Sequence, residues 1–113
     1  MAITSELLGK LGGADIESSD ISLEGAKGIT NIRTVTVPSG ATILAVLIGE
    51  FEISVPSHED TYVRIGGVSV GKPANKAKYL SVAKVLTSTE DIELKNDRYE
   101  ANPFTGTLYL VEM

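Results

Sequence analysis

The segment from Thr34 to Gly49 constrains the fold more than any other part of the chain. Its first residues alternate threonine with valine, which is the period of a half-buried β-strand. Pro38 lacks a backbone N–H and Gly40 accepts the positive φ that a turn needs, so this strand is expected to end there. From Ile43 to Ile48 every residue is apolar, as is typical of a strand covered on both faces. The segment therefore predicts a central β-hairpin and a β core.

The rest of the chain contains further strand patterns, and its 113 residues suffice for one domain with a real core. Phe51, Ile53 and Val55 alternate with polar residues and are expected to face inward. More strands are expected at residues 62–65, 68–70, 92–95 and 107–113. Seven or eight short strands separated by turn residues predict an all-β fold, an antiparallel β-sandwich of the jelly-roll type. The residues expected to be largely buried are Val35, Val37, Ile43, Leu44, Val46, Ile48, Phe51, Ile53, Leu108 and Leu110.

Residues 79–87 permit two interpretations. Their valine content favours a strand, with a bulge where Lys84 falls out of the apolar alternation. The alternative is a helix over residues 75–86.

The N-terminal residues predict a separate short helix and an arm. Residues 3–11 place apolar side chains at helical spacing, with Gly12 and Gly13 as a stop. A helix of this length is not stable in water by itself, and it is therefore expected to dock on its own domain or on a neighbouring subunit. Residues 14–30 are polar and acidic and predict an extended arm, with Gly25 and Gly28 letting it turn. The predicted division is a helix and acidic arm over residues 1–31 and a β-sandwich domain over residues 32–113.

Charge is unevenly distributed along the chain. The net charge of −5 disfavours nonspecific binding of nucleic acid. Residues 61–89 nevertheless contain five bases and no acid, whereas the flanking regions are acidic. Solvated surface lysines are the simpler interpretation. The sharper hypothesis is a protein interface in which the N-terminal stripe and acids of one subunit meet the basic block of the next. The interface residues predicted in this way are Ile3, Leu7, Leu8, Leu11, Asp15, Glu17, Asp20, Arg64, Lys72, Lys76, Lys78 and Lys84.

The sequence offers little for catalysis. Gly67–Gly71 matches the G-x-S-x-G nucleophile motif, but Ser69 would need a following helix and a downstream histidine. The only histidine, His58, lies upstream, and with Glu59 and Asp60 it forms a thin set of metal ligands. The chain has no cysteine and no phosphate-binding glycine pattern. We therefore predict no catalytic residue, no metal site and no cofactor.

No signal peptide or membrane span is expected. The N-terminus lacks a basic region and carries Glu6 where an apolar core would be needed. The apolar run at residues 43–48 is too short to cross a bilayer.

The chain also resembles a known group of proteins. Residues 34–48 together with 106–112 look like the small β-sandwich virion proteins of tailed bacteriophages, including capsid-decoration and tail-associated proteins, and the resemblance covers residues 32–113. It implies a structural role in building or stabilising a particle, with copies of itself and other virion proteins as partners, in a virion assembled in the host cytoplasm. The alternative is a ligand- or carbohydrate-binding sandwich module. That function would need three of Tyr62, Tyr79, Tyr99 and Tyr109 on one face.

Overall fold

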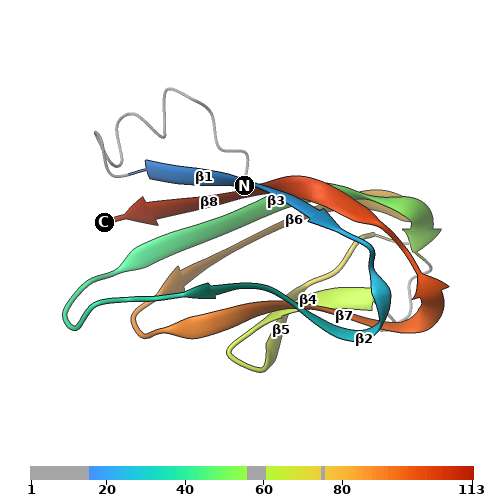
Figure 1. Ribbon diagram of the computed structural model, residues 1–113. Coiled ribbons are helices and arrows are strands. Elements are labelled where there is room, and N and C mark those ends of the chain that lie inside the picture. The colour runs from blue at the N-terminus through green and yellow to red at the C-terminus, as the bar shows by residue number, and fades with distance from the viewer. Residues whose placement is uncertain (1–15, 56–60, 75) are drawn as a thin grey trace.

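The computed structural model describes residues 16–55, 61–74 and 76–113, which form eight β-strands (Figure 1). The predicted helix over residues 3–11 lies outside the described residues. The strands are β1 (Ile16–Leu23), β2 (Ala26–Val35), β3 (Ile43–Val55), β4 (Thr61–Ile65), β5 (Val68–Gly71), β6 (Ala77–Leu86), β7 (Glu90–Ala101) and β8 (Phe104–Glu112). They build two four-stranded sheets, with the order β1-β8-β3-β6 in sheet A and β2-β7-β4-β5 in sheet B. All pairs are antiparallel, so the predicted all-β, antiparallel sandwich is confirmed.

The topology follows from one long hairpin folded over itself. Its tip is the two-residue turn Gly66–Gly67 between β4 and β5, where φ is 63° and 79°. Positive φ at both positions gives a turn whose twist matches that of the strands. Moving outward from this tip, β3 pairs with β6, β2 with β7 and β1 with β8, and successive pairs alternate between the sheets. Eight strands in this order make a jelly roll.

The segment that predicted the central hairpin forms a different connection. The turn is present, because the Ala41 N–H donates to the Pro38 carbonyl at 3.0 Å. The strands on either side nevertheless separate, with β2 in sheet B and β3 in sheet A. The hairpin prediction is wrong because turn residues specify a chain reversal but not which strand becomes the neighbour.

The core lies between the two sheets and is centred on Phe51 and Phe104. Their ring centroids are 4.9 Å apart and the rings are inclined at 54°, a favourable aromatic arrangement. Gly49 is required beside them, since a Cβ there would overlap the Phe104 ring. The aliphatic members of this core include Leu47, Ile65, Leu86, Ile92, Leu94 and Leu108.

Six of the ten predicted buried residues are buried: Val35, Val37, Val46, Phe51, Leu108 and Leu110. Ile43 and Leu44 are half-buried. The predictions for Ile48 and Ile53 are wrong, since their side chains are 38% and 40% exposed. Ile48 faces outward because it alternates with the inward Leu47, and Ile53 lies beyond the last β3–β8 pair, Phe51 with Phe104.

The predicted acidic arm is part of the sandwich in its described portion. Residues 16–23 form β1, which pairs with β8 along its whole length, and the predicted boundary at residue 31 falls within β2. Ile21 and Leu23 pack against the core, which explains why this polar stretch is ordered as an edge strand. The arm prediction failed because an edge strand needs few apolar residues.

Gly25 and Asn102 secure the corner between β1 and β2. Gly25 has φ +67°, and its carbonyl accepts hydrogen bonds from the Asn102 N–H at 3.0 Å and from Asn96 Nδ2 at 2.8 Å. The buried Asn102 side chain accepts from the Ile53 N–H at 2.8 Å and donates to the Ile53 carbonyl at 3.2 Å. These bonds replace strand pairing at the end of β3.

Residues 77–86 form a strand rather than a helix, but the predicted bulge at Lys84 is absent. The register with β3 runs without interruption from Tyr79 to Leu86. Lys84 is in phase with the inward residues Val82 and Leu86, and its Nζ lies 3.9 Å from Glu90 Oε2 in sheet B. Lys84 is tolerated among the inward residues of β6 because its ammonium group meets the carboxylate of Glu90 at the edge of the core.

Candidate functional site

Several charged residues of the predicted interface have partners within the chain. Arg33 Nη2 lies 2.6 Å from Glu17 Oε1, and Arg33 Nη1 donates to Ser19 Oγ at 3.0 Å. In the basic block, Arg64 Nε lies 3.1 Å from Glu93 Oε1. Glu17 and Arg64 thus pair with residues of their own chain that the sequence prediction did not consider.

The remaining predicted interface residues divide into two groups. Asp20, Lys72, Lys76 and Lys78 are exposed, and within residues 16–55, 61–74 and 76–113 the three lysines form no ion pair. They are therefore available to an acidic partner. Ile3, Leu7, Leu8, Leu11 and Asp15 lie outside the described residues.

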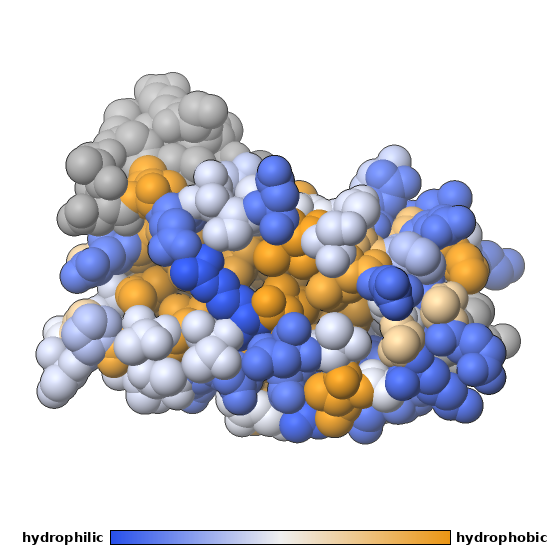
Figure 2. Space-filling view, in the orientation of Figure 1, coloured by the Kyte–Doolittle hydropathy of each residue, from blue (hydrophilic) through white to orange (hydrophobic). Residues whose placement is uncertain are grey.

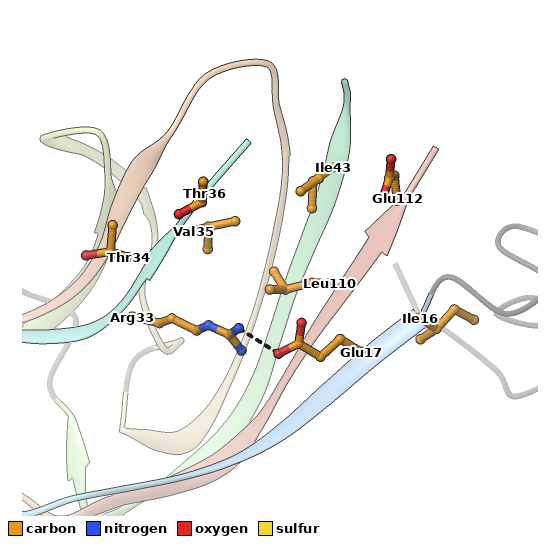
Figure 3. A pocket seen from close by; sticks show the side chains of 9 residues that line it. All are labelled: Ile16, Glu17, Arg33, Thr34, Val35, Thr36, Ile43, Leu110 and Glu112. Carbon is orange, nitrogen blue, oxygen red and sulfur yellow. Dashed lines mark ion pairs between the residues drawn. The ribbon is translucent and has the colours of Figure 1, made fainter. Parts of the chain in front are cut away.

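The Arg33–Glu17 pair crosses the open side of the sandwich, where β1 and β2 are the edge strands of the two sheets (Figure 3). A hollow of about 370 Å³ lies there. The space-filling view shows apolar surface along this side, interrupted by hydrophilic side chains (Figure 2). The hollow is lined by Ile16, Glu17, Arg33, Thr34, Val35, Thr36, Ile43, Leu110 and Glu112. Since Arg33 and Glu17 neutralise each other, we assign the pair to closing the sandwich edge.

A second hollow, of about 560 Å³, contains the serine of the G-x-S-x-G match. It is lined by Tyr62, Ser69, Gly71, Lys72 and Asp97. Ser69 lies in β5, and the chain continues from Gly71 through residues 72–74 into β6 rather than into the helix that a nucleophile elbow requires. His58 lies outside the described residues. Among the residues that the structure describes, no three His, Asp or Glu side chains are grouped to hold a metal.

Near this hollow, Lys95 has a perturbed pKa. A hydrogen bond with the Tyr62 side chain, and then attraction to Asp97, raises the pKa of Lys95 above its usual 10.5. Its Nζ lies 3.6 Å from Asp97 Oδ2 and 5.8 Å from the Tyr62 ring centroid. The shift keeps the ammonium charged at neutral pH, so Lys95 is not arranged as a general base.

The outer face of sheet B carries polar pairs beside the exposed Ile29, which shares a row with Lys95 and Tyr62. Thr34 donates to Asp91 Oδ1 at 2.6 Å, and the Arg64–Glu93 and Lys95–Asp97 pairs continue along the same face. Antiparallel sheets commonly have one such solvated face.

The outer face of sheet A is apolar at one end and polar at the other, where Asp20, Thr107 and Ser81 share the row of Ile48. Antiparallel pairing aligns Ile16, Val111, Leu44 and Val85 across the four strands, because cross-strand partners share a face. The next outward row contains Tyr109, Val46 and Ala83, and the row after it contains Ile48. We call the side chains of Leu44, Val46, Ile48, Val85, Tyr109 and Val111 the apolar face.

Burial across the apolar face is uneven. Val46 and Val111 are only 1% and 0% exposed, although neither belongs to the core cluster between the sheets. Val85 is 49% exposed, like the exposed Ile48 in the third row. The sequence analysis identified one of the two strands that are apolar on both faces, since the run from Ile43 to Ile48 predicted a strand covered on both sides. The matching run in β8, from Leu108 to Val111, was missed as a second two-sided strand.

The described tyrosines do not form the three-ring platform of the alternative function. Tyr79 and Tyr109 lie on the outer face of sheet A, whereas Tyr62 alternates with buried residues of β4 and faces outward from sheet B. Because these rings are on opposite sides of the sandwich, they cannot stack on one ligand.

Comparisons with protein-family models, with curated proteins and with solved structures find no match. Across the described ranges, no helix has the length and hydrophobicity to cross a membrane.

Proposed function

We propose that this protein is a non-enzymatic structural subunit that assembles through its apolar face, as a capsid-decoration or tail-associated component of a bacteriophage virion. The observation that carries the proposal is the contrast between the two outer faces. Sheet B presents ion pairs and hydrogen bonds to water around one exposed isoleucine, Ile29, whereas sheet A presents the exposed Ile48 and Val85 beside a row that is apolar in all four strands. The partners are further copies of the chain and other virion proteins.

The energetics favour association through this face. Fully burying an exposed aliphatic side chain contributes roughly 1.5–3 kcal/mol. Ile48 and Val85 are 38% and 49% exposed, so covering each of them gains less than half of that amount. The edge strand β6 belongs to the same sheet, and Lys76 and Lys78 lie at its start, whereas Lys72 follows the end of β5 in sheet B. These lysines, which form no ion pair among the described residues, add attraction for an acidic partner surface, and salt screens such attraction.

The test is the mass in solution, measured by light scattering over a range of protein concentrations. The wild-type protein should form an oligomer, and Ile48→Glu with Val85→Glu should shift it toward the monomer, because two charges cannot be buried without partners. The matched control is Val68→Glu, since Val68 is 61% exposed but lies beside the Gly66–Gly67 turn of sheet B. A wild-type monomer at every concentration, or equal effects of both variants, would contradict the proposal.

A further inference from the structure

We propose that two copies of this chain pair antiparallel through their β6 strands, so that sheet A continues from one subunit into the next. The partner at this edge is a second copy of the chain. This pairing rests on the proposed function, since it specifies the contact through which copies of the subunit associate.

Of the four edge strands in the described ranges, β6 is the least protected against such pairing. Natural sheets protect their edges with short strands, bulges, proline or charge. β5 has only four residues, and the register of β2 with β7 shifts twice. β1 contains three serines and two acids, and its Glu17 forms an ion pair across the open side. β6 has ten residues without proline or acid, and its register with β3 is regular from Tyr79 to Leu86.

The neighbouring strand of sheet B lies beneath β6 and does not continue its sheet. A Cβ on Gly71 would overlap the Val82 side chain, so β5 approaches the inward side chains of β6. In its own sheet β5 pairs with β4. Among the described strands, the N–H and C=O groups of β6 that point away from β3 therefore have no strand partner.

The outward side chains along this edge are exposed. Tyr79 is 72% exposed and Val85 is 49% exposed, and Ser81 and Ala83 between them are exposed as well. Directly opposite residues share a face of a sheet, so these four must lie opposite one another when two β6 strands pair.

One register suits the side chains best, and it is centred on Val82. It places Val85 opposite Tyr79 of the partner subunit, an aromatic and β-branched pair of the kind that stabilises sheets. It also places Ser81 opposite the partner's Ala83, and Lys84 opposite the partner's Leu80. The two-fold axis repeats each contact, so the interface closes a dimer.

The neighbouring registers are poorer. Centring the pair on Ser81 would place Lys78 opposite Lys84 of the partner subunit, and like charges directly opposite are destabilising. Centring it on Ala83 would place Tyr79 opposite Thr87, which lies beyond the end of β6. Lys84 is an inward charge of the kind that can protect an edge, but Glu90 of its own chain neutralises it across 3.9 Å.

Disulfide formation between two single-cysteine variants tests the register, because the natural chain contains no cysteine. Tyr79→Cys and Val85→Cys are mixed and oxidised, and we expect the mixed disulfide as the main product. Either variant oxidised alone should give little dimer, since its cysteine lies about 20 Å along the strand from that of its partner. Val68→Cys mixed with Val85→Cys is the control, because Val68 lies in sheet B. Equal yields of mixed and self disulfides would overturn the register.

Charge substitutions at two exposed positions examine the same pairing without a cross-link. Ser81→Lys with Ala83→Lys places lysine opposite lysine twice, and light scattering should then give the monomer mass. Ser81→Glu with Ala83→Lys places opposite charges together and should retain the dimer. Neither variant changes a core side chain. Equal masses for the two variants would contradict the pairing.

The pairing and the proposed function can fail separately. An oligomer that gives no mixed disulfide would overturn the β6 pairing and leave assembly through the apolar face standing. A mixed disulfide together with an unchanged mass of Ile48→Glu would support the pairing and refute assembly through that face. A wild-type monomer at every concentration would overturn both.

Discussion

The guanidinium of Arg33 lies 2.6 Å from the carboxylate of Glu17, and this contact joins the edge strand of sheet B to the edge strand of sheet A. The two edge strands, β1 and β2, belong to different sheets and do not pair with each other. Glu17, which the charge pattern assigned to a neighbouring subunit, therefore has a partner within the chain. An intermolecular contact by Glu17 would have to compete with Arg33.

Removing the Arg33–Glu17 pair should have a small, measurable effect. Because both side chains are partly exposed to water, the coupling in a double-mutant cycle of Glu17→Ala and Arg33→Ala should be about 0.2–1 kcal/mol. Denaturant unfolding measures it, and the coupling should decrease at high salt. Additive effects of the two substitutions would show that the pair does not fasten the edge.

Gly25→Ala should be strongly destabilising. Position 25 has φ +67°, and a Cβ there would overlap the Asn102 carbonyl oxygen, so backbone strain and a clash combine. Gly40→Ala is the matched control, since Gly40 has φ +81° but open space around it. We expect a loss of about 1 kcal/mol for the control and several times more for Gly25→Ala by chemical denaturation. Equal losses would mean that the corner relaxes around the methyl group.

Asn102→Ala should lower the free energy of unfolding by about 1–3 kcal/mol, because it leaves the Ile53 N–H and carbonyl without their side-chain partner. The exposed Asn31 makes a single 3.4 Å side-chain contact with Thr34 and provides a control. Asn31→Ala should change the stability by less than about 0.5 kcal/mol. If the two variants unfold at the same urea concentration, the Asn102 side chain does not stabilise the corner between β1 and β2.

Charges introduced on the two faces of β3 should have different outcomes. Leu47→Asp places a charge in the core between the sheets and should abolish cooperative folding, since total stability is only about 5–15 kcal/mol. Val46→Asp is on the outer face of sheet A, outside the core between the sheets. We expect this variant to melt cooperatively at a lower temperature. If Val46→Asp is as unfolded as Leu47→Asp, the outer face of sheet A is as necessary for folding as the core between the sheets.

The strands themselves could largely be predicted from local patterns. Alternation located most of them, whereas the hairpin turn at Gly66–Gly67 was not predicted. The pairing of β1 with β8 could not be predicted, because Ile16 and Val111 are joined by contacts between opposite ends of the chain that leave no local signal. The same limitation explains the mistaken hairpin at Pro38, since its turn chemistry is equally compatible with a crossing between sheets.

The candidate surface was only partly predictable. The apolar run from Ile43 to Ile48 indicated a second covered face, but identifying that face required the register that places Val46 beside Tyr109. Glu17 and Arg64 looked like free interface charges because their partners, Arg33 and Glu93, become neighbours only through pairing of the sheets.

The sheet order also fixes when the protein can fold. In sheet A, β8 lies between β1 and β3, so two strands made early have no partner on that side until residues 104–112 have been synthesised. Non-local pairing of this kind slows folding and exposes unpaired edges meanwhile. A nascent chain arrested before β8 would thus hold β1 without its ladder, and the cell must protect it until the final described strand leaves the ribosome.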